Sequence, residues 1–179
     1  MIEDQFIDRI EPVLRELGAA REAGESFSSP PLDVLVYYAR RARIGRVPIL
    51  GRALGVTAIV RQPVDVEGSA AGYHRLLTRL AMAVNGRFSP RHGLIIGLTA
   101  IVLTPEPIAP GDDAMLRQAL DTRLRRLRIV PFGLLRVNLG QEAMAMALSA
   151  SPDDVFPESA RLADLLCEEL RRYVPLILP

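Results

Sequence analysis

Gly93-Leu-Ile-Ile-Gly-Leu-Thr-Ala-Ile-Val-Leu-Thr-Pro105 is an uncharged run that decides the fold of this chain. It is rich in β-branched side chains, which favour strands over helices. It ends at a proline, which cannot donate a hydrogen bond to a neighbouring strand. The run therefore predicts a buried central strand, and the rest of the chain must supply elements that cover it.

A second stretch repeats part of this pattern. Val56-Thr-Ala-Ile-Val-Arg-Gln-Pro63 and Leu98-Thr-Ala-Ile-Val-Leu-Thr-Pro105 share an apolar-Thr-Ala-Ile-Val-x-x-Pro sequence, and a segment of helical periodicity follows each. We expect both to be strands of one sheet. The helix between them allows a right-handed crossover to a parallel strand, and an antiparallel return through the longer loop is the alternative.

Composition indicates one soluble globular domain that spans residues 1–179. Hydrophobic residues make up 49% of the chain and charged residues 24%, which argues against general disorder. No apolar run reaches the roughly 18 residues that a membrane span needs, and the acidic start Met1-Ile-Glu-Asp is unlike a signal peptide. We expect a cytoplasmic protein without a membrane span.

Several kinds of chemistry are excluded by missing residue types. All 22 basic residues are arginine, so a Schiff-base lysine and the lysine of a phosphate-binding loop are absent. His74 and His92 have no metal-ligand spacing, and Cys167 lies among leucines as a small buried residue would. We expect no cofactor and no catalytic residue.

Helical periodicity predicts four amphipathic helices. Gly18 is suited to ending the first helix, and Asn85-Gly86 to ending the second. Ser69 is suited to capping the start of the second helix, and Asp112-Asp113 to starting the third. The predicted helices span residues 2–17, 69–85, 112–127 and 158–174.

The remaining segments predict strands and connections. Segment 32–43 has both a helical stripe and an alternating pattern, and its β-branched and aromatic content favours a strand. Segment 128–139 is predicted as a third strand of edge type because of Pro131, and 141–149 fits either a hairpin partner or a short buried helix. We expect a flexible connection at 19–31, a wide turn at 44–55 and an apolar tail at 175–179.

Together these elements predict an α+β fold. A single mixed β-sheet would contain 56–62, 94–104 and 128–139, and about four amphipathic helices would cover it.

Two groups of arginines are candidate interface or anion-binding residues: Arg40, Arg41, Arg43 and Arg46, and Arg123, Arg125, Arg126 and Arg128. Arginine forks pair well with carboxylates across subunit interfaces. The second group also suits the C-terminus of a helix. Because aromatic platforms are scarce near them, a nucleic-acid surface is a less favoured alternative.

Three acids offer an alternative reading as a metal site. Asp65 and Glu67 follow the first of the two repeated strands, and Glu106 follows the second. Carboxylates at the ends of neighbouring strands can bind a divalent cation. With arginine as an anion clamp, they would suit an enzyme that acts on phosphates or nucleic acid.

Residues 2 to about 104 resemble the small α+β proteins that terminate or complete phage tails and related contractile injection machines. The similarity lies in the start Met1-Ile-Glu-Asp-Gln-Phe-Ile-Asp-Arg-Ile10, in Pro31-Leu-Asp-Val-Leu-Val-Tyr37, and in Val56-Thr-Ala-Ile-Val60 followed by Ala71-Gly-Tyr-His-Arg-Leu-Leu-Thr-Arg-Leu80. The Gly-Tyr-x-x-Leu-Leu helix is similar to that of the Mu-like tail proteins. The resemblance implies rings of subunits and no catalytic residues.

The sequence therefore predicts a non-enzymatic structural or assembly subunit that binds protein partners, with a homo-oligomer as the expected form. The alternatives are the metal-dependent enzyme and a nucleic-acid-binding module that uses the arginines between Arg40 and Arg46.

Overall fold

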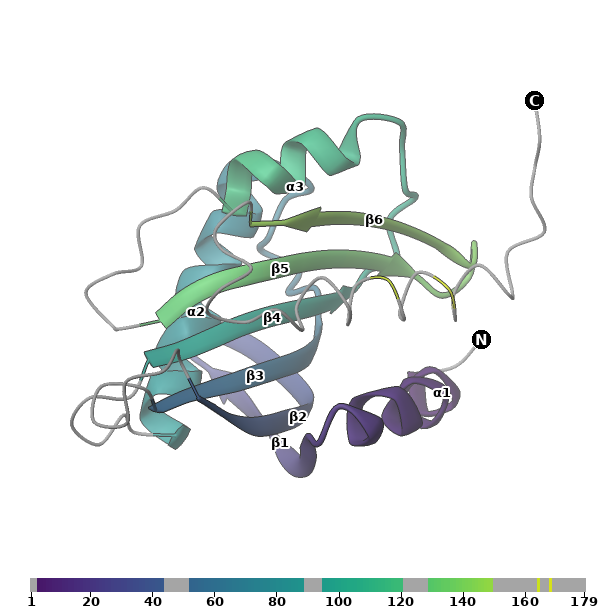
Figure 1. Cartoon of the computed structure of the whole chain (residues 1–179). Helices are drawn as coiled ribbons and strands as arrows, with labels where there is room; N and C mark the ends of the chain where they lie inside the picture. Colours follow the sequence, from purple (N-terminus) through teal and green to yellow (C-terminus); the bar gives the residue numbers. More distant parts are fainter. Residues whose placement is uncertain are drawn as a thin grey trace.

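The computed structural model describes residues 3–43, 52–88, 95–120 and 129–149, together with Asp164 and Glu168. Figure 1 shows the arrangement of these elements around one sheet. In chain order they are α1 Glu3–Glu16, β1 Ala20–Ser28, β2 Pro31–Arg43, β3 Arg52–Arg61, α2 Ala70–Phe88, β4 Ile95–Leu103, α3 Asp112–Leu120, β5 Ile129–Asn138 and β6 Ala143–Leu148.

The sheet is mixed, as predicted, and its six strands lie in chain order from β1 to β6. β3, β4 and β5 are parallel to one another, whereas β1, β2 and β6 pair antiparallel with their neighbours. The two repeated stretches are β3 and β4, and they pair residue for residue, from Val56 with Leu98 to Val60 with Val102. The expectation of one shared sheet is confirmed, and the parallel crossover is the correct alternative.

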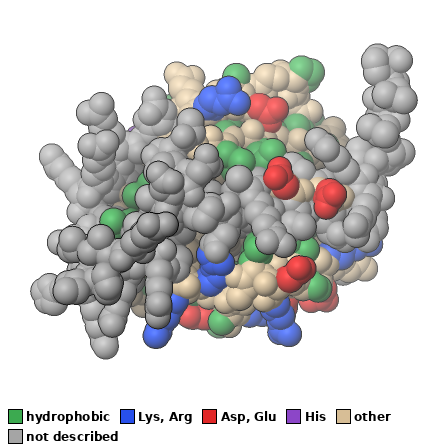
Figure 2. Space-filling model, in the orientation of Figure 1, with side chains coloured by type: hydrophobic (Ala, Val, Ile, Leu, Met, Phe, Trp, Pro, Cys, Tyr) green, Lys and Arg blue, Asp and Glu red, His purple; other side chains and the backbone are tan. Residues whose placement is uncertain are grey.

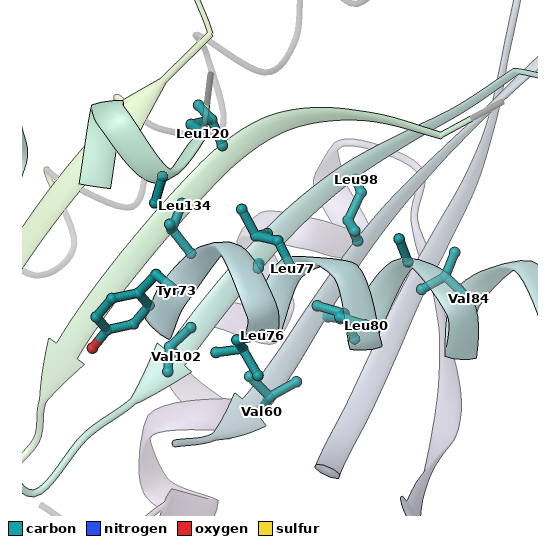
Figure 3. Packing of buried hydrophobic residues seen from close by; sticks show 14 of the residues in the cluster. Val60, Tyr73, Leu76, Leu77, Leu80, Val84, Leu98, Val102, Leu120 and Leu134 are labelled. Carbon is teal, nitrogen blue, oxygen red and sulfur yellow. The ribbon is translucent and has the colours of Figure 1, made fainter. Parts of the chain in front are cut away.

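Helices cover both faces of the sheet. α2 and α3 pack on one face, where Leu76, Leu77 and Leu80 of α2 lie over Val60 and Val102 of the strands (Figure 3). α1 packs on the opposite face through an apolar stripe formed by Phe6, Ile7, Ile10 and Leu14. This division into two cores explains why the central strands carry apolar side chains on both faces.

Local signals end and begin the helices where the sequence predicts. Gly18, with a φ of 79°, follows α1, and the amides of Gly18 and Ala19 donate to the carbonyls of Arg15 and Leu14, which is a Schellman motif. The Ser69 hydroxyl accepts a hydrogen bond of 3.1 Å from the amide of Gly72 and so caps α2.

The sequence predicts that α2 ends at Asn85-Gly86. In the structure α2 continues to Phe88. The Phe88 ring packs edge-on against Tyr37 with centroids 5.6 Å apart, and Arg87 ion-pairs with Glu22. These contacts with the β1–β2 hairpin outweigh the weak helix propensity of Gly86, which is about 1 kcal/mol less favourable than alanine.

The predicted flexible connection at 19–31 is wrong. Residues 20–28 form β1, an edge strand paired with β2 from Ala20–Ala39 to Ser28–Pro31. Its residues are exposed or half-buried, so the strand lacks the alternation that burial of one face would impose. β2 itself confirms the strand prediction for 32–43, and β3 begins at Arg52, within the segment predicted as a turn.

Two further strand predictions are settled. Segment 141–149 contributes β6, the hairpin partner of β5, rather than a helix. β5 is not an edge strand, because it lies between β4 and β6. Pro131 is tolerated there because the β4–β5 register shifts directly after it, so that Leu98 pairs with Pro131 but Thr99 pairs with Gly133.

The described residues form three of the four predicted helices. The fourth, at 158–174, lies outside them apart from Asp164 and Glu168, which are helical and exposed. His92, Cys167, the tail at 175–179 and residues 121–127, which were predicted as the end of the third helix, also lie outside them.

None of the helices in the described part of the chain is long and apolar enough to cross a membrane. On the face drawn in Figure 2, hydrophobic side chains are visible at the surface together with charged and polar ones where described residues are drawn. Phe27, Val64 and Met82 are the large hydrophobic side chains exposed among the described residues.

Candidate functional site

The parallel strands give the sheet two chemically different edges. The first residues of β3, β4 and β5 lie at one edge, and their last residues lie at the other, which we call the amino edge and the carboxyl edge. Ligands of open α/β sheets bind outside the carboxyl ends of the strands. The loops 62–69, 104–111 and 139–142 meet at this carboxyl edge, and all three are described.

Arg136 of β5 is the centre of the carboxyl edge. Its side chain is 4% exposed, and its two terminal nitrogens lie 2.9 Å from Glu106 Oε2 and 2.6 Å from Asp112 Oδ2. The guanidinium carbon lies 5.9 Å from the centre of the Tyr73 ring. Gly68 packs against the same pair, since a Cβ at this position would lie 2.7 Å from Glu106 Oε2. The cluster therefore joins β5, the loop after β4 and the start of α3.

Asn138 and Gln141 fix the loop after β4 in place. The Asn138 amide nitrogen donates to the carbonyls of Pro105 and Glu106, at 3.1 and 2.8 Å. The Gln141 backbone amide donates to Asn138 Oδ1, and Gln141 Oε1 accepts from the amide of Ile108. The side chains of Asn138 and Gln141 are thus engaged with the protein's own loop.

Asp65, Glu67 and Glu106 are not grouped as potential metal ligands among the described residues. Both carboxylate oxygens of Asp65 accept hydrogen bonds from Arg79, at 2.9 and 2.5 Å, and this arginine holds the pKa of Asp65 below its usual value. Glu106 is paired with Arg136, and Glu67 is exposed. No group of three potential metal ligands occurs within the described ranges.

Tyr73 does not offer an acid or base at this edge. Burial raises its pKa to about 12, against the opposing effect of Arg136, so its hydroxyl stays protonated at neutral pH. The hydroxyl donates to Gln62 Oε1 at 2.9 Å. Tyr73 therefore acts as a structural hydrogen-bond donor between α2 and the end of β3.

Arg40 and Arg41, which are neighbours on β2, have different surroundings. The Arg40 guanidinium donates to the Leu17 carbonyl at 2.9 Å and so completes the C-terminus of α1, and burial lowers its pKa. Arg41 is exposed. Since successive strand residues point to opposite faces, the two side chains diverge. Arg43 ends β2, where its backbone is paired in register with Arg52.

Arg46, Arg123, Arg125, Arg126 and Arg128 lie outside the described residues. The elements beside them are nevertheless placed. Arg40, Arg41 and Arg43 end β2 beside the start of β3, and the second group directly precedes β5; both β3 and β5 begin at the amino edge. The two groups therefore join the described chain at the same edge of the sheet.

At the amino-edge ends of β2, β3, β4 and β5, every charged residue that the structure describes is an arginine. Residues 39–43, 52–56, 95–97 and 129–131 contain four arginines and no carboxylate, so their formal charge is +4. We call this set the basic edge. Its members are Arg40, Arg41, Arg43 and Arg52.

The carboxyl edge has the opposite charge. This edge is formed by residues 31–33, 61–69, 104–113 and 139–143. These segments contain seven carboxylates and Arg61. Together with Glu3, Arg75, Arg79 and Arg136, which interact with them, they give eight carboxylates and four arginines, a net charge of −4. We call this set the acidic edge. Its members are Glu3, Asp33, Asp65, Glu67, Glu106, Asp112, Asp113 and Glu142, with Arg61, Arg75, Arg79 and Arg136.

The sequence reasoning missed the role of Arg136. The available signal was a single charged residue within the apolar run Phe132-Gly-Leu-Leu-Arg-Val-Asn-Leu139, because a buried charge requires a partner. Its partners, Glu106 and Asp112, follow other elements, so the sequence alone does not identify them.

Comparison with known proteins assigns no function to these two edges. No protein-family model, no curated protein and no solved structure matches this chain.

Proposed function

We propose that this protein is a non-enzymatic structural or assembly subunit that works by binding other protein chains. The observation that carries the proposal is that Arg136, Asn138 and Gln141 at the carboxyl edge bind the protein's own residues. A site prepared for catalysis would hold its acid, base or metal ligands free for a substrate. Here Asp65, Glu106 and Asp112 are instead paired with arginines.

We further propose a place for it in a phage-tail-like or contractile machine, as a terminator or connector. The support is the sequence resemblance of residues 2 to about 104. Proteins of this kind contribute shape and surface, so the pairing of Asp65, Glu106 and Asp112 with arginines is consistent with the proposal.

The experiment is density-gradient sedimentation of an extract from cells that make the protein, followed by detection of the chain with an antibody. We expect it to sediment with a particle far larger than its own 19.7 kDa. Negative-stain microscopy of that fraction then shows whether the particle is tail-like. Sedimentation as a free monomer at every stage of growth would contradict the assembly role.

Titration calorimetry with Mg²⁺ and Mn²⁺ tests the competing enzyme hypothesis. Because Asp65 and Glu106 are bound to arginines, we expect no binding heat for either ion. Binding that is lost on Asp65→Asn substitution would favour the metal-dependent enzyme instead.

A further inference from the structure

We infer that copies of this chain associate head to tail, with the acidic edge of one copy against the basic edge of the next. The inference rests on the proposed assembly function and names the partner as a second copy. Its carrying observation is the opposite charge of the two edges, +4 and −4, on surfaces at opposite ends of the same parallel strands.

The two edges are far enough apart to act as separate surfaces. β3 has 10 residues, and at about 3.3 Å per residue it separates the edges by roughly 30 Å. This is about three times the screening length of roughly 10 Å at 0.1 M salt. The charges at one edge are therefore felt by a neighbouring molecule rather than cancelled by the other edge.

Helix dipoles do not account for the acidic edge. α1 starts there, since Glu3 pairs with Arg61, and so do α2, which follows β3, and α3, whose Asp112 pairs with Arg136. Three helix N-termini contribute about +1.5 charges in total. They offset less than half of the net charge of −4, so an excess of carboxylate remains for an external partner.

The groups needed for contact are accessible. Glu67 and Arg41 are exposed, and the side chain of Glu106 is 44% exposed although it is paired with Arg136. Arginine and carboxylate groups make strong paired hydrogen bonds across interfaces.

Opposite charges at opposite ends favour one symmetry over another. A two-fold dimer would place each edge against itself and so bring like charges together, which costs several kcal/mol. Contact between two different surfaces is heterologous, and it produces a ring if the rotation closes and an open chain if it does not. The expected products are therefore chains or rings rather than a closed dimer.

The test is analytical ultracentrifugation of the purified chain over a range of protein concentrations, at 0.1 M and at 1 M NaCl. At 0.1 M we expect the mass to rise with concentration beyond that of a dimer. At 1 M we expect association at least about tenfold weaker, since the screening length falls to roughly 3 Å. A chain that stays monomeric at 0.1 M at every concentration, or associates equally at both salts, overturns the inference.

Charge-reversal variants identify the surfaces. Arg41→Glu with Arg43→Glu lowers the net charge of the basic edge from +4 to zero, and Glu67→Arg with Glu142→Arg brings that of the acidic edge from −4 to zero. We expect each variant alone to associate at least about tenfold less than the native chain. An equimolar mixture of the two should recover association as far as heterodimers, because the unchanged acidic edge of the first variant can pair with the unchanged basic edge of the second. Circular dichroism melts check that both remain folded. Arg117→Glu, an exposed position in α3 outside both edges, is the matched control and keeps native association.

Two results would contradict this assignment of surfaces. One is a mixture no more associated than its components, and the other is an Arg117→Glu variant as impaired as the edge variants. Binding of a DNA oligonucleotide by the monomer, lost in the Arg41→Glu, Arg43→Glu variant, would instead assign the basic edge to nucleic acid. Each of these outcomes concerns the purified chain alone, so the inference can fail while sedimentation in a large particle still supports the assembly role.

Discussion

Glu11 connects α1 to the sheet through a carboxylate that is 9% exposed. It accepts hydrogen bonds from Arg21 at 2.6 Å and from the Tyr38 hydroxyl at 3.0 Å, and Arg15 lies 2.5 Å away. Burial acts to raise the pKa of Glu11, but the hydrogen bonds from Tyr38 and Arg21 and the two positive charges outweigh it, and the pKa is lowered. The charged form is therefore the one that stabilises α1.

Replacement of Glu11 by alanine should lower the free energy of unfolding by about 1–3 kcal/mol, because it leaves a buried tyrosine hydroxyl without its acceptor. Urea denaturation measures the change. Glu16→Ala, at an exposed position of the same helix, is the control and should stay within about 0.5 kcal/mol of the native value. Equal effects of the two substitutions would show that Glu11 does not hold α1.

The same residue predicts a pH dependence. Because the pKa of Glu11 is lower in the folded state than the ordinary 4.5, its contribution is complete above that value and is lost as the pH falls through the lowered pKa. We expect the stability of Glu11→Gln to fall less steeply than that of the native protein below about pH 4.5. Parallel pH profiles of the two proteins would disprove this.

Arg136 makes the strongest single-residue prediction at the carboxyl edge. Arg136→Met leaves Asp112 and Glu106 without their partner and should cost about 3 kcal/mol of stability, since breaking a buried ion pair strands a charge. Adding Asp112→Asn should recover part of the loss in a double-mutant cycle. Arg75→Met, on the exposed face of α2, is the control, and a cost for Arg136→Met no larger than for Arg75→Met would refute the prediction.

At the scale of elements, the limits of sequence reasoning are clearest in the β1–β2 hairpin. β1 was predicted as a flexible connection because its glycine, serines and charges are weak strand formers, and an edge strand exposed on both faces shows no burial pattern. β2 showed two patterns at once for a physical reason. A register shift between Val34 and Val36 moves Val34 to the α2 side and Val36 to the α1 side, so neither a helical stripe nor simple alternation fits the whole strand.

Glycine substitutions test the hairpin directly. A Cβ on Gly24 would lie 2.0 Å from the Val34 carbonyl oxygen, whereas a Cβ on Gly86 in α2 would meet nothing within 4 Å. Gly24→Ala should therefore lower the melting temperature, with a cost of at least about 2 kcal/mol. Gly86→Ala should raise the melting temperature, with a gain of about 0.5–1 kcal/mol in the free energy of unfolding, because alanine is the better helix former. Thermal melts that moved in the same direction would contradict the prediction.

At the scale of the whole molecule, the sequence predicted the fold class and the central strands but not the candidate site. Uncharged β-branched runs and capped amphipathic helices are local signals, so β3, β4, α1 and α2 could be recognised. The basic edge depends on β3 and β5 being parallel, which is a property of the completed sheet. Likewise, the sequence suggested Asp65 as a metal ligand in the alternative reading, whereas in the structure Asp65 is paired with Arg79 of α2. The sequence alone does not show this pairing, because the two residues belong to separate segments.

Buried tyrosines on both faces of the sheet predict alkaline unfolding. The pKa values of Tyr37, Tyr38 and Tyr73 are all raised above the ordinary 10, mainly by burial. The unfolded chain therefore loses these protons at lower pH than the folded protein, and stability should fall above pH 10 by up to about 1.4 kcal/mol per pH unit for each tyrosine. Urea denaturation between pH 9 and 11 measures the slope, and Tyr73→Phe should reduce it by one tyrosine's share. A slope that Tyr73→Phe leaves unchanged would contradict this.

The residue-for-residue match between β3 and β4 also affects how the chain must fold. Two segments with the same Thr-Ala-Ile-Val core are almost equally good partners for either segment of another molecule, and parallel pairing of like segments is the geometry of fibrous aggregates. Within one molecule, α2 keeps the correct partner tethered nearby, and that advantage shrinks as protein concentration rises. The repeat that builds the centre of the sheet is thus also the segment most exposed to mispairing between newly made chains.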